Sequence, residues 1–200
     1  MSIICSPLCA STLSQIQWAQ ECDNTHRPGG VSRLVFYKCD PDYAFPEAGS
    51  WANLDNWSDA ICNGIIFFSG EVLGQKPKGT FTKRRLGSCS PEKTISGSKT
   101  VTFQDFNADP DFADYDFWNN VASLKRFLQA GWITCDDRLF MVTGDFDLEI
   151  DEVAEDNSDG ASFFDGTLTF QSREIIKPVQ VDGLNDFLAS FDVATHCYGY

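Results

Sequence analysis

Four carboxylates at every second position are the first candidate for chemistry in this sequence. The acidic residues of this stretch are Asp145, Asp147, Glu149 and Asp151, and they alternate with Phe146, Leu148 and Ile150. A period of two predicts a β-strand with one buried and one exposed face. Paired carboxylates perform acid–base catalysis in glycosidases, but one of the pair then needs an apolar pocket that raises its pKa. Four like charges on one face repel each other and must stay solvated, so the pattern favours an acidic surface over a catalytic pair.

Other candidates for chemistry have simpler structural explanations. The two histidines, His26 and His196, lie in segments that we expect to be exposed, and no Gly-rich loop feeds a helix. Glu155–Gly160 is spaced like the start of a calcium loop, but Gly166 occupies the twelfth position, so a hairpin turn is the better interpretation. An acidic cluster precedes a predicted helix and can bind a cation loosely or cap that helix; it comprises Asp109, Asp111, Asp114 and Asp116. We therefore expect no catalytic residue, no metal and no cofactor, and do not expect an enzyme.

The eight cysteines are loosely spaced and are expected to be mostly reduced and partly buried. No export signal or long apolar span is recognisable in the sequence. A zinc site remains an alternative for the first four cysteines, although a C-x3-C pair without a second close pair is a weak match. These four are Cys5, Cys9, Cys22 and Cys39.

Charge is distributed unevenly along the 200 residues, which carry a net charge of −14. Residues 1–100 contain 10 Lys and Arg against 9 Asp and Glu, whereas residues 101–200 contain 5 against 20. This acidity argues against a protein that grips nucleic acid by its phosphates, but not against one that DNA must pass without sticking. A basic block interrupts the first half, and its principal members are Lys76, Lys78, Lys83, Arg84 and Arg85. The block either contacts the acidic half of another copy, head to tail, or serves solubility alone.

Strands dominate the predicted secondary structure. The predicted strands are Val31–Lys38, Ile65–Ser69, Gly79–Arg85, Thr100–Phe106, Trp132–Thr134, Arg138–Thr143, Asp145–Val153 and Ser162–Gln171. Residues 1–30 are interpreted as an N-terminal arm that orders against a partner, and residues 31–200 as one domain. Residues 70–98, rich in Gly, Pro and basic side chains, are predicted to form a hairpin or loop that extends from the body.

Three helices are predicted among these strands. The best has a stripe formed by Phe117, Val121, Leu124 and Leu128, with Trp118 and Phe127 beside it and Gly131 as its end. Shorter helices are indicated by Leu54, Trp57 and Ile61, closed by Gly64, and by Leu184, Phe187, Leu188 and Phe191. The order of elements predicts a mainly β, α+β fold: an antiparallel β-sandwich or barrel with one packed central helix, a long hairpin and short peripheral helices.

The order of elements from about Val31 to Leu188 resembles that of tail tube (major tail) proteins of long-tailed bacteriophages. The resemblance rests on TVTFQDF, an Asp-rich turn, FWNNVASLKRFLQAG, ITCDDRLFMVTG and DFDLEIDEV. The first thirty residues and the WANLDNWSDAICNG helix depart from it. They leave open another virion component, such as a head–tail connector, a tail terminator or a capsid-attached protein.

The resemblance implies a structural virion protein that assembles in the host cytoplasm into hexameric rings, which stack into a tube for DNA passage. It implies that Asp145, Asp147, Glu149 and Asp151 face the lumen, where they would repel DNA phosphates. The basic block would then contact the acidic surface of the next ring, and other virion proteins would be further partners. A different class, a monomeric carbohydrate- or receptor-binding module, would need an exposed aromatic platform. Trp51 and Trp57 are its candidates, although helical spacing favours the core for Trp57.

Overall fold

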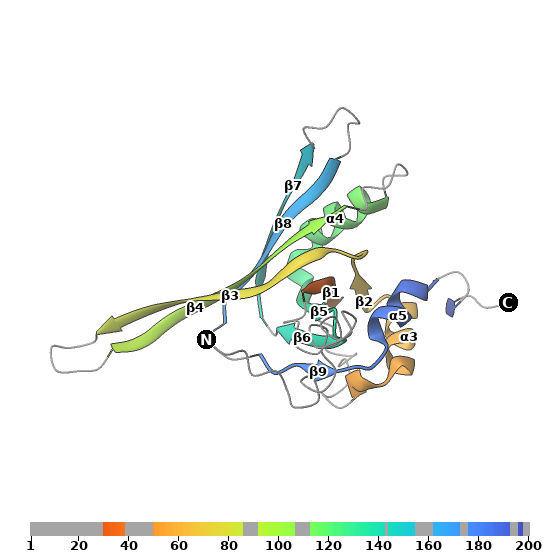
Figure 1. Ribbon diagram of the computed structural model, residues 1–200, viewed down its shortest axis with the longest axis horizontal. Coiled ribbons are helices and arrows are strands. Elements are labelled where there is room, and N and C mark those ends of the chain that lie inside the picture. Colours follow the sequence, from red (N-terminus) through yellow and green to blue (C-terminus); the bar gives the residue numbers. More distant parts are fainter. Residues whose placement is uncertain are drawn as a thin grey trace, which may run out of the picture.

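Nine antiparallel strands form a single sheet in the computed structural model, which describes residues 30–38, 50–85, 92–106, 113–142, 144–154, 162–172, 176–192 and 196–197. The strands are β1 (Val31–Lys38), β2 (Ile66–Phe68), β3 (Leu73–Arg85), β4 (Glu92–Asp105), β5 (Leu128–Thr134), β6 (Arg138–Val142), β7 (Phe146–Ala154), β8 (Ser162–Phe170) and β9 (Val179–Gln180). Their order is β7-β8-β4-β3-β1-β5-β6-β9, with β2 also paired to β1 (Figure 1). The predicted arm lies outside the described residues.

Helices cover both sides of this sheet. They are α3 (Leu54–Cys62), α4 (Ala113–Leu124) and α5 (Leu184–Ser190), with short 3-10 turns η1 (Ser50–Ala52) and η2 (Lys125–Phe127). In Figure 1, α4 lies beside β8, and α3 and α5 lie next to each other on the other side of the body. No helix in the described part of the chain has the length and hydrophobicity needed to span a membrane.

The sheet curls over itself, which gives the mainly β, α+β architecture a barrel-like core. Three strands separate β1 from β7 in the sheet order, so a flat sheet would hold the two strands roughly 19 Å apart. Yet the rings of Phe36 and Phe146, one from each strand, have centroids only 5.8 Å apart. Trp132 of β5 and Phe170 of β8 lie 5.7 Å apart across the same core. The predicted sandwich or barrel with a packed helix is therefore confirmed in its general form.

Strand β1 is buried on both faces because a core lies on each side of it. Leu34 and Phe36 point into the core that contains Trp118 of α4. Val35 points into a second core with Trp57 of α3 and further residues of α5. The sequence of a strand that is covered on both faces is a continuous apolar run, not an alternation of apolar and polar residues. The structure confirms the predicted boundaries of this strand, residues 31–38. Its burial on both faces explains why the sequence pattern is clear.

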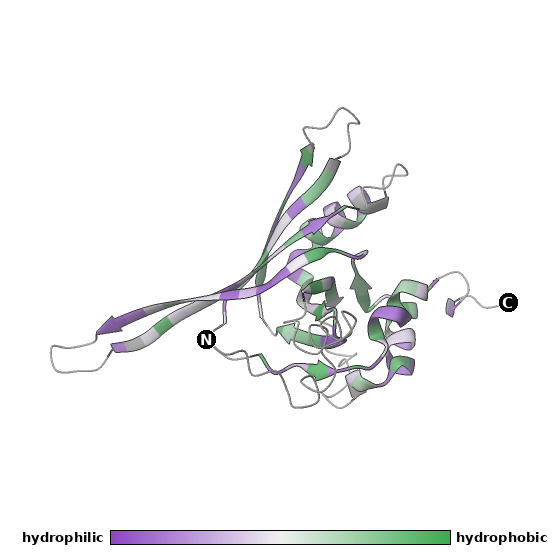
Figure 2. Ribbon diagram, in the orientation of Figure 1, coloured by the Kyte–Doolittle hydropathy of each residue, from purple (hydrophilic) through white to green (hydrophobic). Residues whose placement is uncertain are grey.

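The β3–β4 ribbon confirms the predicted long hairpin. The two strands pair from Leu73↔Gln104 to Arg85↔Glu92, whereas β4 pairs with β8 only from Lys99 onward. The outer part is therefore a two-stranded ribbon that extends from the body (Figure 1), and hydrophilic residues cover much of it (Figure 2). Strand β3 begins at Leu73, earlier than predicted. It can include Pro77, which lacks an N–H donor, because that residue falls within a shift in register between Gln75 and Lys78.

The central helix is shorter than predicted, and its expected end at Gly131 is wrong. The helix α4 ends at Leu124, and β5 begins at Leu128, in register with β1. Gly131 lies within β5, where a Cβ would come within 2.3 Å of the Phe140 carbonyl oxygen. Its lack of a side chain thus permits the close approach of β6 rather than ending a helix. Phe127, predicted to lie beside the apolar stripe, is 67% exposed.

The acidic residues near the start of α4 are also placed differently from the prediction. Asp114 and Asp116 lie inside the helix, which begins at Ala113, so neither is the cap residue. A carboxylate in the first turn still interacts favourably with the positive end of the helix dipole. Asp109 and Asp111 lie outside the described residues.

Candidate assembly surfaces

The acidic strand has the two-faced character that its alternation predicts. Its four acidic side chains, referred to below as the acidic face, are all exposed: Asp145, Asp147, Glu149 and Asp151. Phe146 and Leu148 are each only 7% exposed and belong to the same core as Trp118 of α4, with Ile150 partly buried beside them. The strand thus contributes apolar side chains to the core and presents carboxylates to solvent.

The acidic face extends onto the neighbouring strand. Asp165 of β8 is exposed and pairs directly with Asp151 of β7. Like charges opposite each other in a sheet destabilise it, so both carboxylates need solvent or a cationic partner. The alternation of Ser162–Gln171 could have placed Asp165 on the outer face, but only the strand register shows which carboxylate it faces.

One carboxylate of the acidic face is held by a lysine. The Nζ atom of Lys125 lies 2.8 Å from Oδ1 of Asp147, and this hydrogen bond, with the charge of the ammonium group, lowers the pKa of Asp147. The two ion pairs seen within the described ranges are this one and Arg138–Asp136. Neither involves Asp145, Glu149 or Asp151.

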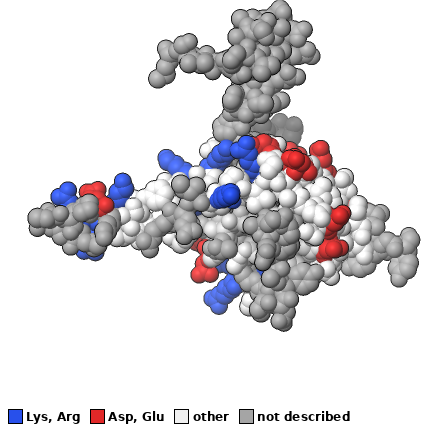
Figure 3. Space-filling model, turned by 90° about the horizontal axis from the view of Figure 1, so that it is seen from below, with Lys and Arg blue, Asp and Glu red and all other residues white. Residues whose placement is uncertain are grey.

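The basic side chains lie on the ribbon and are also exposed. We use the term basic ribbon for Lys76, Lys78, Lys83, Arg84 and Arg85. None of the five forms an ion pair with a residue in the described part of the structure. Figure 3 shows Lys and Arg side chains gathered around the outer end of the ribbon, with acidic atoms beside them. The exposed apolar side chains of Phe81 and Ile95 lie on the same two strands, 48% and 40% exposed.

A groove of about 590 Å³, which we call the edge groove, lies between α4 and β7. Its lining residues are Tyr115, Trp118, Asn119, Ala122, Leu148, Glu149, Ile150, Asp151, Glu152 and Phe164. Successive side chains of a strand point to opposite faces, so a groove lined by five consecutive β7 residues runs along the edge of that strand. Because β7 is the last strand in the sheet order, this edge has no neighbouring strand among the described elements. No local sequence pattern predicts the groove, because it depends on how α4 packs against β7.

Polar contacts cross between α4 and β7 on either side of the groove. The Tyr115 hydroxyl donates to Oε1 of Glu152 at 2.5 Å, and the Lys125–Asp147 pair joins the following turn to the same strand. Trp118 and Phe164, which are 3% and 4% exposed, form the apolar part of the lining. The groove therefore combines an aromatic floor with an acidic rim.

The aromatic platform considered for a binding module is not present at the predicted residues. Trp51 is only 8% exposed and Trp57 is fully buried. Their rings meet edge to face at 5.6 Å, and the Trp57 indole donates to the Trp51 carbonyl oxygen at 2.9 Å. Both residues are therefore part of the core under α3, and the spacing argument for Trp57 is confirmed.

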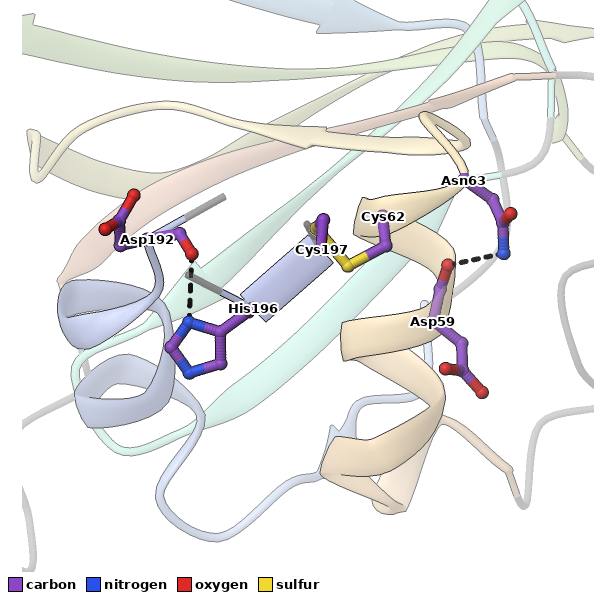
Figure 4. Close-up of a disulfide and its surroundings, with 6 residues drawn as sticks. All are labelled: Asp59, Cys62, Asn63, Asp192, His196 and Cys197. Atoms are coloured by element: carbon purple, nitrogen blue, oxygen red, sulfur yellow. Dashed lines mark hydrogen bonds between the residues drawn. A yellow bond between two sulfur atoms is a disulfide. The ribbon is translucent and has the colours of Figure 1, made fainter. Parts of the chain in front are cut away.

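A disulfide joins Cys62, at the end of α3, to Cys197 near the C-terminus (Figure 4). The expectation of reduced thiols is wrong for this pair. The two cysteines are 135 residues apart in sequence, so spacing gave no indication that the fold brings them together. Cys135 is exposed rather than partly buried. Cys5, Cys9, Cys22, Cys39 and Cys89 lie outside the described residues.

The remaining candidates for chemistry do not form a reactive group in the described part of the chain. His196 stacks on Phe191 with ring centroids 4.6 Å apart, and its Nδ1 lies 2.9 Å from the Asp192 carbonyl oxygen. Across the described ranges, no three or more His, Cys, Asp or Glu side chains come together as metal ligands would. His26 and the Glu155–Gly160 segment fall outside those ranges.

Comparison of the sequence with protein-family models finds no matching family, and a search of curated proteins finds no similar sequence. The resemblance to tail tube proteins therefore remains a prediction.

Proposed function

We propose that this chain is a structural virion protein that assembles with copies of itself into rings, hexameric as in phage tail tubes, through which DNA passes. The observation that carries the proposal is the separation of opposite charges on one chain. Lys83, Arg84 and Arg85 of the basic ribbon lie on the part that extends from the body, whereas the acidic face lies along β7 and the residue before it. Most of these charges have no ion-pair partner within the described structure. Such a molecule attracts a second copy in a defined orientation, because each copy carries both halves of the contact.

The geometry of the ribbon supports this proposal. Residues 80–85 of β3 and residues 92–98 of β4 extend beyond the part where β4 pairs with β8, which corresponds to roughly 20 Å of chain. A two-stranded hairpin has little stability of its own in water. A ribbon of this length is suited to contact a neighbour, because it carries exposed apolar side chains and cations that form no ion pair with the residues described.

The acidic face supports the passage of DNA. In a ring whose inner wall carries Asp145, Asp147, Glu149 and Asp151, carboxylates would repel the phosphates, and no counterions would be released by contact. The disulfide fits a virion protein, because disulfides persist in oxidising surroundings such as virion surfaces. A connector, a tail terminator or a capsid-attached ring would use the same contacts and stays as the alternative within this proposal.

Mass and shape measurements at low and high salt test the assembly. Light scattering and negative-stain microscopy of the purified protein should show rings or tubes that loosen as the salt concentration rises, because salt screens exposed charges. A compact monomer at every protein and salt concentration would contradict the proposal.

A charge reversal on the acidic face tests the lumen. In assembled rings, Asp145→Lys should increase retention of DNA in a salt-dependent way, whereas the matched exposed variant Asp186→Lys on α5 should not. Equal DNA retention by both variants would mean that the acidic face does not line a channel.

A further inference from the structure

The edge groove has the charge and shape to bind a cationic segment. Its rim carries Glu149, Asp151 and Glu152, and its floor is aromatic. An ammonium or guanidinium group is attracted to carboxylates, and more strongly when water is excluded. The aliphatic stem of a Lys or Arg side chain can also pack on the apolar part of the lining. The groove volume of about 590 Å³ falls within the roughly 300–1,000 Å³ typical of ligand sites.

The same chain carries a segment with matching chemistry. Lys83, Arg84 and Arg85 are consecutive and exposed near the end of β3, and Phe81 is 48% exposed two residues before them. Three successive cations and an exposed aromatic side chain two residues before them present both charge and apolar area to a partner. The groove offers the complement of each.

Docking within one molecule is ruled out by the direction of the ribbon. In Figure 1 the ribbon points away from the body on the side opposite to α3 and α5, whereas α4 and β7 rise along a different direction. The ribbon is a continuous extension of strands that are themselves paired in the sheet, so it cannot turn back onto α4 without breaking that pairing. The occupant must come from another molecule.

We propose that the edge groove between α4 and β7 binds the Phe81–Arg85 end of the ribbon of a second copy of this chain. This inference rests on the proposed self-assembly and names the contact that drives it. The free edge of β7 supplies backbone donors and acceptors beside the carboxylates, so the arriving strand has partners for its own backbone groups. Glu149 and Asp151 border both the groove and the acidic face, so on this inference the neighbour's ribbon would cover them and they would not line the channel. Asp145 and Asp147 lie outside the groove lining and would remain as the carboxylates that face DNA, with Asp147 also paired to Lys125.

Photo-crosslinking in the full-length protein gives a direct test. A benzophenone amino acid in place of Asn119, an exposed residue of the groove lining, should crosslink to a peptide that contains residues 79–85 of another copy. The same probe at Asn120, which is exposed on α4 but does not line the groove, should give at least about tenfold less of that product. Mixing isotopically light and heavy protein identifies the crosslink as intermolecular.

Complementary charge reversals provide the second arm. Glu149→Lys with Asp151→Lys, or Lys83→Glu with Arg84→Glu, should each raise the protein concentration needed for half-maximal assembly by about tenfold or more, and an equimolar mixture should assemble better than either alone. The control for the groove variant is Asp55→Lys with Asp59→Lys, at exposed positions of α3. It makes the same change in net charge as the groove variant and should leave assembly close to wild type. Circular dichroism confirms that each variant is folded.

The outcomes separate this inference from the proposed function. If wild-type protein forms rings or tubes but Asn119 crosslinks to segments other than the ribbon, or if the groove reversals assemble as well as the α3 control, the groove contact is wrong and self-assembly stands. If wild-type protein remains a monomer throughout, both are overturned.

Discussion

The indole of Trp118 donates its N–H to Oδ2 of Asp105 at 3.0 Å, and both side chains are buried, 3% and 1% exposed. Trp118 also stacks on Phe103 with ring centroids 5.2 Å apart. This single residue therefore joins α4 to β4 by a polar and an apolar contact. A buried carboxylate that loses a donor is costly, because water cannot replace the bond.

Trp118→Phe should accordingly lower the free energy of unfolding by about 1–3 kcal/mol, measured by urea denaturation. Trp132→Phe is the matched control: Trp132 is similarly buried, but its indole N–H has no hydrogen-bond partner among the residues that the structure describes. It loses packing but no hydrogen bond, so its cost should be smaller. Equal losses for the two variants would show that the bond to Asp105 contributes nothing.

At the level of elements, α5 depends on a carboxylate from a distant turn. Its own cap residue, Gly183, provides no side-chain hydrogen bond. Instead, Asp137 in the β5–β6 turn accepts the backbone N–H of Gly183 at 3.0 Å and that of Asn185 at 2.9 Å. Asp137 also receives the Asn185 side-chain amide, so one turn holds the start of the helix in place.

Asp137→Ala should lower the free energy of unfolding by about 1–2 kcal/mol, the usual cost of a lost cap. The positive φ of 58° at this position adds to the cost, because alanine tolerates left-handed backbone less well than aspartate. Thermal denaturation followed by circular dichroism provides the measurement. The control is Asp186→Ala, at an exposed position in the first turn of α5, which should change the free energy of unfolding by only a few tenths of a kcal/mol. If Asp186→Ala destabilised the protein as much as Asp137→Ala, the loss of a negative charge near the helix start would explain both results.

Elements that are patterned by local sequence are predicted well, and those decided by tertiary pairing are not. The apolar run of β1 and the alternation of β7 define their strands, because burial on two faces or one leaves a distinct pattern. The spacing of Phe127 and Leu128 continues a helical period, yet pairing of Leu128 with Lys38 of β1 places it in a strand. Tertiary contacts outweigh helix propensity, which is worth less than 1 kcal/mol per residue.

The candidate surfaces show the same division. Exposure of the acidic face follows from alternation alone, and exposure of the basic ribbon follows from its composition. The pairing of Asp151 with Asp165 and the edge groove require the strand register and the position of α4, and neither is encoded in a local pattern. The disulfide requires the whole fold, because its cysteines lie on α3 and at the C-terminus.

On the scale of the whole molecule, this disulfide closes a loop that spans most of the chain. Cross-linking two residues that are 135 positions apart removes much of the freedom of the unfolded chain, and the chain-entropy relation gives up to about 5 kcal/mol. It also anchors the C-terminal residues to α3, the helix that covers the second core.

Cys62→Ser should therefore lower the free energy of unfolding by about 2–5 kcal/mol and reduce the effect of reductant on stability. Thermal denaturation with and without dithiothreitol measures both effects, with Cys135→Ser as the control for loss of an exposed cysteine. Wild-type protein whose melting temperature is the same with and without reductant would contradict a stabilising role for the bond.

The position of β1 in the middle of the sheet has a consequence for how the chain folds. Its hydrogen-bond partners include β5, about a hundred residues later, and Ser32 also bonds to Asn185, 153 positions away. During synthesis, β1 is soon followed by its partners β2 and β3 but leaves the ribosome long before β5 exists, so one of its edges stays unpaired. The β3–β4 and β7–β8 hairpins, by contrast, can form as soon as they are made. Non-local pairing slows folding, and an unpaired apolar strand is prone to aggregate in the meantime. The second core includes Leu184 and Leu188 of α5 beside Val35 of β1, so we expect nascent chains to need protection of this face of β1 until α5 has been made.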